Sequence, residues 1–95
     1  MVVYEVYYAD VLIGHLQVEN GLHQYLPDGD SIRSIQQKVF LLREMTEFHP
    51  WGTPIPFFDQ MIRNNKRIGR EKEIYYHNNR CNLRMIPETD FAAFR

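Results

Sequence analysis

The chain has 95 residues, of which 44% are hydrophobic, 14% aromatic and 24% charged, and its formal net charge is -1. This length fits one domain, residues 1–95, and the charge gives no reason to expect bulk affinity for nucleic acid or for an anionic membrane. The single cysteine excludes an internal disulfide, and without a signal peptide or a membrane-length apolar run we expect a cytoplasmic protein with no membrane partner.

The N-terminal region predicts a meander of three antiparallel strands. Val and Tyr dominate its first strand, which suits a pleated, half-buried surface. Asn20-Gly21 lies between apolar runs and is typical of a type I′ hairpin turn, because that turn needs positive φ at both central residues. Gly14 interrupts the alternation and indicates a β-bulge or a close backbone approach. The predicted strands are residues 2–8, 11–18 and 22–26.

The middle of the chain is harder to assign. Residues 27–30 predict a loop in which Pro, Asp and Gly take turn roles. Asp30 or Ser31 can cap a short helix, since their side-chain oxygens accept from unpaired backbone N–H groups. The apolar run at residues 39–42 either ends this helix or forms a strand, and periodicity does not decide between the two. Residues 46–53 are expected to be irregular.

The pattern becomes helical at residues 54–64. Pro56 suits the first turn, where its missing N–H is not needed. Asn64-Asn65 or Gly69 can end the helix. Two i,i+4 pairs form one apolar stripe that we expect in the core: Phe57 with Met61, and Phe58 with Ile62.

The C-terminal region predicts a second hairpin. Residues 74–77 and 80–86 flank Asn78-Asn79, a pair suited to a two-residue turn. Residues 88–95 then form a tail or a short terminal helix. The predicted fold class is α+β: a small curved antiparallel sheet, made of the meander and this hairpin, packed on one or two short helices.

No residue pattern predicts a catalytic, metal or cofactor site. Cys81 alternates with Leu83 and Met85 in a predicted strand, so we expect a core thiol whose pKa is raised by burial. The glycines are isolated and form no phosphate-binding loop. We therefore expect a protein that is not an enzyme. The histidines lie in different elements and give no zinc pattern: His15, His23, His49 and His77.

The charge distribution and one tryptophan indicate a contact surface. Residues 1–32 contain no Lys or Arg, whereas residues 63–72 contain a cationic run. That run is either a solvated helix end or a patch for an acidic protein or for phosphates. Trp51 is either a core plug or, if partly exposed, an interface anchor. The partner-binding hypothesis names Trp51, Arg63, Lys66, Arg67, Arg70 and Tyr75.

Two motifs resemble the N-terminal subdomain of HipA-type toxin kinases. The family's opening strands and Tyr/Phe-x-Pro segment are similar to Ile13-Gly14-His15-Leu16 and Tyr25-Leu26-Pro27. Its helix-opening Phe-Phe-Asp-Asn is similar to Pro56-Phe57-Phe58-Asp59. The resemblance covers residues 4–64. The family's Pro-Leu-Ser-rich segment is replaced by residues 39–49, and the kinase body is missing.

This resemblance implies a free-standing, HipS-like protein of a bacterial toxin–antitoxin system. Such a protein is a non-catalytic antitoxin or regulatory subunit that binds and restrains a separate HipA-type Ser/Thr kinase. A DNA-binding antitoxin in the same complex is a further partner that the resemblance allows. The alternative function is nucleic-acid binding, with residues 63–72 supplying charge and the following tyrosines supplying stacking.

Overall fold

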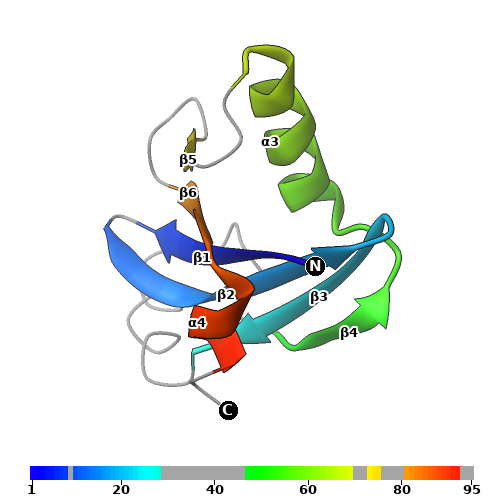
Figure 1. Cartoon of the computed structure of the whole chain (residues 1–95), viewed down its shortest axis with the longest axis vertical. Coiled ribbons are helices and arrows are strands. Elements are labelled where there is room, and N and C mark those ends of the chain that lie inside the picture. The colour runs from blue at the N-terminus through cyan, green and yellow to red at the C-terminus, as the bar shows by residue number, and fades with distance from the viewer. Residues whose placement is uncertain (9, 29–46, 70–72, 76–80, 93–95) are drawn as a thin grey trace.

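The computed structural model describes residues 1–8, 10–28, 47–69, 73–75 and 81–92. These residues contain six strands in one antiparallel sheet, in the order β4-β3-β2-β1-β6-β5, and two helices (Figure 1). The predicted α+β fold is therefore confirmed. The elements are β1 Val2–Tyr8, β2 Val11–Glu19, β3 Leu22–Pro27, β4 His49–Gly52, α3 Pro56–Arg67, β5 Glu73–Tyr75, β6 Cys81–Ile86 and α4 Glu88–Ala92.

The predicted N-terminal meander is confirmed in β1, β2 and β3. The turn between β2 and β3 has φ of 51° at Asn20 and 75° at Gly21. Both values are positive, as a type I′ turn requires, and the local twist of such a turn matches that of the flanking strands. The sequence of this turn therefore determines the β2–β3 register, which runs from Gly14–Pro27 to Glu19–Leu22.

Gly14 is both a bulge residue and a point of close approach. The β1–β2 register shifts between Val6 and Tyr7, which leaves Ile13 as the extra residue on β2. A Cβ at Gly14 would meet the Tyr25 hydroxyl and would lie 2.7 Å from a backbone carbonyl oxygen. The same hydroxyl donates a hydrogen bond to the Ile13 carbonyl at 3.3 Å. Both alternatives predicted for this glycine are therefore confirmed.

The prediction that residues 46–53 are irregular was wrong for β4. This strand pairs with β3 through His23–Gly52 and Tyr25–His49. Its sequence contains Pro50 and has no alternation, so local pattern gave no strand signal. Pairing with β3 supplies the order instead, and a proline is tolerated because β4 is the edge strand.

α3 begins with Pro56 in its first turn and ends at Arg67, so it starts later and runs further than the predicted residues 54–64. Gly69, with φ of 75°, follows the helix, and its N–H donates to the Lys66 carbonyl at 3.1 Å. Of the predicted terminators, Gly69 is thus the one used. Asn65 lies inside the helix, where its Nδ2 donates to the Met61 carbonyl at 2.8 Å.

α3 packs its apolar stripe on one face of the sheet. Phe58 and Met61 are buried, and Phe57 and Ile62 are partly buried against the same cluster. Cys81 is buried in this core, and burial raises its thiol pKa to about 12. The predicted helix stripe and core thiol are confirmed. The sheet residues of the core are Tyr4, Val6, Tyr8, Ile13, Leu16, Tyr25, Cys81 and Leu83.

The C-terminal elements also follow the prediction. β5 and β6 pair as an antiparallel hairpin, and α4 is the short terminal helix. Its Phe91 ring lies 5.2 Å from the His15 ring, between centroids. His15 and the core residue Leu16 are neighbours on β2, so their side chains point to opposite faces of the sheet. α4, which contacts His15, therefore packs on the face opposite α3.

Some expectations fall outside the described residues. They are the Asn78-Asn79 turn, the capped helix after residue 30 and the assignment of residues 39–42. Among the helices that the structure describes, none has the length and apolar character needed to cross a membrane.

Candidate protein-binding surface

Three large apolar side chains are exposed where β3 and β4 form the sheet edge. The exposed fractions are 46% for Leu22, 55% for Phe48 and 39% for Trp51. We call these three residues the edge surface. Of the two interpretations of Trp51, the core plug is therefore excluded. The side chain is partly exposed, as an interface anchor must be.

The strand register places the three residues of the edge surface beside the β3–β4 pairing. On β3, His23 and Tyr25 are buried on the α3 side, so the alternating Leu22 lies on the other side. Trp51 and Phe48 directly precede the two residues, Gly52 and His49, that pair with that buried pair, and the pairing shifts register between these two points. The pairs are His23 with Gly52 and Tyr25 with His49.

The backbone of β4 is poorly suited to pairing with a further strand. Pro50 is exposed on this edge and has no N–H to donate. The chain then turns, and the His49 ring nitrogen Nε2 lies 3.2 Å from the Thr53 carbonyl oxygen. A partner at this edge would therefore contact side chains of the edge surface rather than extend the sheet.

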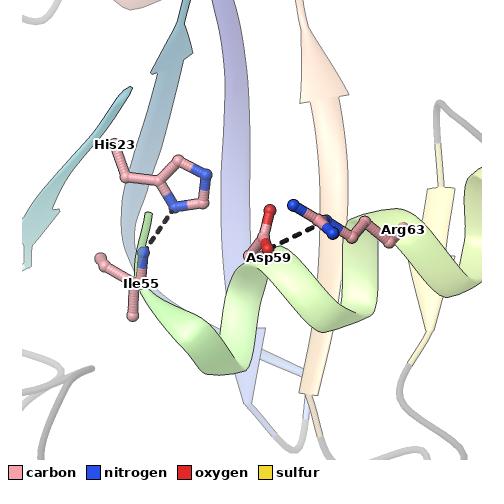
Figure 2. Close-up of polar contacts among 4 residues, drawn as sticks. All are labelled: His23, Ile55, Asp59 and Arg63. Carbon is pink, nitrogen blue, oxygen red and sulfur yellow. Dashed lines mark hydrogen bonds and ion pairs between the residues drawn. The ribbon is translucent and has the colours of Figure 1, made fainter. Parts of the chain in front are cut away.

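A buried histidine joins the edge to α3. His23 Nδ1 accepts a hydrogen bond from the Ile55 N–H at 3.0 Å, across 32 residues of sequence (Figure 2). Ile55 is the N-cap residue of α3 and has no side-chain cap, so the imidazole gives the helix start a fixed partner. This bond requires a lone pair on Nδ1, which places the proton of the neutral ring on Nε2.

The environment of His23 favours its neutral form. Burial is the main cause that lowers its pKa, His49 lowers it further, and the Asp59 carboxylate raises it. Sequence reasoning left this histidine without a role. Its alternation with Tyr25 could have indicated burial, but no sequence signal identifies a backbone partner 32 residues away.

The predicted cations Arg63, Lys66 and Arg67 lie on α3. The Arg63 Nε lies 3.0 Å from Asp59 Oδ2, one helical turn away, and the arginine side chain is 76% exposed (Figure 2). Such a pair contributes about 0.3–0.5 kcal/mol on a helix surface. Lys66 and Arg67 are exposed in the last turn, followed by Ile68, which is also exposed. We call these last three residues the cationic end.

The predicted partner-binding residues do not form one surface. Trp51 belongs to β4 and Tyr75 to β5, and these strands are the two opposite edges of the sheet. α3 contacts β5, whereas its first residues lie beside β3. Arg70 falls outside the described residues. The hypothesis therefore divides into the edge surface and the cationic end.

The face opposite α3 also carries polar side chains. Gln17 is fully buried, and neither its Nε2 nor its Oε1 has a hydrogen-bond partner in the described part of the chain. Burial raises the pKa of Tyr7, and the neighbouring Glu5 carboxylate adds to this, while Arg84 opposes it. Across the described ranges, no three His, Cys, Asp or Glu side chains gather to hold a metal ion.

A scan against protein-family models, a search of curated proteins and a search of solved structures each found no match to this chain.

Proposed function

We propose that this chain is a non-catalytic, cytoplasmic antitoxin-type subunit that binds and restrains a separate HipA-type Ser/Thr kinase. The observation that carries the proposal is the edge surface, in which Trp51, Leu22 and Phe48 are all exposed beside the β3–β4 pairing. Large apolar side chains that remain exposed together on a small domain are typical of contact surfaces.

The expected strength of this contact follows from the side chains involved. Fully burying an apolar side chain of this size contributes about 1.5–3 kcal/mol, and tryptophan is enriched among interface hot spots. The exposed fractions of the three residues, 39% to 55%, leave roughly half of that contribution for a partner to realise. Trp51 is the anchor of the proposed interface, and Leu22 and Phe48 surround it.

The two motifs that resemble the kinase subdomain meet inside the core. The Tyr25 and Phe58 rings lie 5.4 Å apart between centroids, and the Tyr25 hydroxyl covers Gly14. Residues of both motifs thus depend on each other for packing. This arrangement supports the interpretation that they mark a shared scaffold rather than a chemical site.

The nucleophile candidates also support a non-catalytic role. The Cys81 thiol is buried with its pKa raised to about 12, so at neutral pH it is not the thiolate that nucleophilic chemistry needs. His23 uses Nδ1 to hold a backbone N–H rather than to accept a proton from a substrate. The cationic end would orient an acidic region of the kinase through long-range attraction.

Binding to a HipA-type Ser/Thr kinase from the same genome, measured by calorimetry, tests the proposal. We expect Trp51→Ala to weaken binding about 30-fold or more, since hot-spot truncation costs at least about 2 kcal/mol. Val11→Ala is the matched control, because Val11 is 47% exposed but lies at the start of β2, outside the edge surface and the cationic end. Equal effects of the two variants, or no binding by the parent chain, would overturn the proposal.

A titration with labelled single-stranded DNA and RNA at low salt tests the alternative function, nucleic-acid binding. We expect no binding, because Arg63 is already paired with Asp59 and the net charge is -1. Binding that falls steeply with salt, is lost in Lys66→Glu and is unchanged in Trp51→Ala would favour nucleic-acid recognition instead.

A further inference from the structure

We propose that His23 is a proton-sensitive latch, whose neutral imidazole ties β3 to the start of α3 and whose protonation releases residues 52–55 together with Trp51. The latch itself rests on the geometry of this chain alone. Its role as a regulator of partner binding rests on the proposed function.

One residue holds both ends of the segment between β4 and α3. The backbone of His23 pairs with Gly52, and its side chain accepts from the Ile55 N–H at 3.0 Å. Figure 2 shows the ring directed at the backbone just before the first turn of α3. Trp51 directly precedes this segment, so the position of the edge surface depends on it.

Protonation is incompatible with the latched geometry for three physical reasons. The added proton would occupy the Nδ1 lone pair and face the Ile55 N–H, placing two donors against each other. The ring is 2% exposed, so its charge would be buried. The charge would also lie near the positive end of the α3 dipole, which disfavours cations.

The charged groups around His23 come from two elements. Asp59 of α3 favours the protonated ring, but this carboxylate is already paired with Arg63 at 3.0 Å. His49 of β4 opposes protonation, as does burial. The β2 residue that pairs with His23 is Val18, which has no charge.

The sign of the pH dependence follows from the direction of the shift. Burial lowers the pKa of His23 below its ordinary value of 6.5. The open form therefore takes up a proton at a higher pH than the latched form. The latched form is fully favoured above pH 6.5 and becomes less favoured as the pH falls through the lowered pKa. In total, the latching equilibrium constant falls tenfold for each pKa unit by which His23 differs between the open and latched forms.

NMR spectroscopy of the whole chain between pH 7.5 and 5 tests the latch. At pH 7.5 we expect the His23 ring nitrogens to report the Nε2–H tautomer. On acidification, the Ile55 amide and the Trp51 indole should shift with one common midpoint below 6.5. An Nδ1–H tautomer, or an Ile55 amide that does not respond to pH, would overturn the proposal.

Two variants separate His23 from the other titrating groups. In His23→Asn, the amide oxygen can accept from Ile55 without titrating, so the common transition should disappear while the fold is retained. His15→Asn is the control, because His15 lies on the opposite face with its pKa also lowered by burial, and this variant should keep the transition. A transition that survives in His23→Asn contradicts the latch, and the tautomer measurement decides the question if that variant does not fold.

Calorimetry at pH 7.5 and 5.5 with the kinase tests the regulatory role. Affinity should fall at the lower pH by the same factor as the latched fraction measured in the isolated chain, and His23→Asn should show no such fall. A pH transition in the isolated chain without kinase binding removes the proposed function and leaves the latch. Kinase binding without that transition removes the latch and leaves the function.

Discussion

The two faces of the sheet differ in how their polar atoms are satisfied. On the face toward α3, the Tyr25 hydroxyl donates to a carbonyl and His23 Nδ1 accepts from a backbone N–H. On the opposite face, both amide atoms of the buried Gln17 and the Oδ1 of Asn82 lack hydrogen-bond partners among the described residues. Both faces bury side chains, but among the described residues only the α3 face does so without leaving buried side-chain polar atoms unpaired.

This difference indicates where the fold gains its stability. A buried polar group without a partner costs about 1–3 kcal/mol. Burying one methylene group contributes about 0.8 kcal/mol, so each such polar group cancels the burial of roughly one to four methylene groups. The α3 face combines apolar packing with satisfied polar atoms, so we infer that it contributes most of the stability. The opposite face contributes less.

The largest expected effect comes from emptying the α3 face. Phe58→Ala should lower the free energy of unfolding by about 3–5 kcal/mol, because the ring is fully buried between Tyr25 and Phe57. Urea denaturation measures this loss. Phe91→Ala on the opposite face should cost about 2 kcal/mol, because Phe91 is buried but lies on the short α4, which we expect to shift and fill part of the space. Equal losses would contradict the comparison.

Adding a methyl group at the closest contact of the α3 face should have the next largest effect. Gly14→Ala should destabilise by about 1–3 kcal/mol, because its Cβ would meet the Tyr25 hydroxyl. In a Tyr25→Phe background the cost of Gly14→Ala should become smaller, though not zero, because a backbone carbonyl also lies 2.7 Å from that Cβ. A cost unchanged by Tyr25→Phe would place the strain elsewhere.

The opposite face should respond to substitution with the reverse sign. Gln17→Leu removes two unpaired amide atoms at similar volume, so we expect the protein to become more stable by about 1–2 kcal/mol. Gln24→Leu is the matched control, because Gln24 pairs with Gln17 in register but is only partly buried. Its effect should stay within about 0.5 kcal/mol. A loss of stability in Gln17→Leu would mean that its amide has a partner.

The smallest effect is expected at the solvent side of α3. Asp59→Asn removes the pair with Arg63 and should cost no more than about 0.5 kcal/mol, since the arginine side chain is 76% exposed. Thermal denaturation at low and high salt measures it. The difference from the parent should disappear at high salt, where exposed charges are screened. A difference that persists would mean that this pair acts through packing.

The sequence predicted those features that depend on neighbouring residues. The Asn20-Gly21 turn and the place of Pro56 in the first turn of α3 follow from the backbone preferences of single residues, and the close approach at Gly14 follows from its missing Cβ. β4 was missed because its order comes from pairing with β3, and its own sequence contains a proline. The division between edge surface and cationic end was also missed, because only the strand order shows that Trp51 and Tyr75 lie at opposite edges.

The burial of the single thiol has a kinetic consequence. Cys81 is the chain's one cysteine, it is 1% exposed, and it lies on β6, between β1 and β5. A thiol reagent can reach it only when the sheet opens, so the rate of labelling reports the population of open molecules when opening and closing are fast. The protein thus contains an intrinsic probe of its own opening, whose labelling rate can be compared with and without a proposed partner.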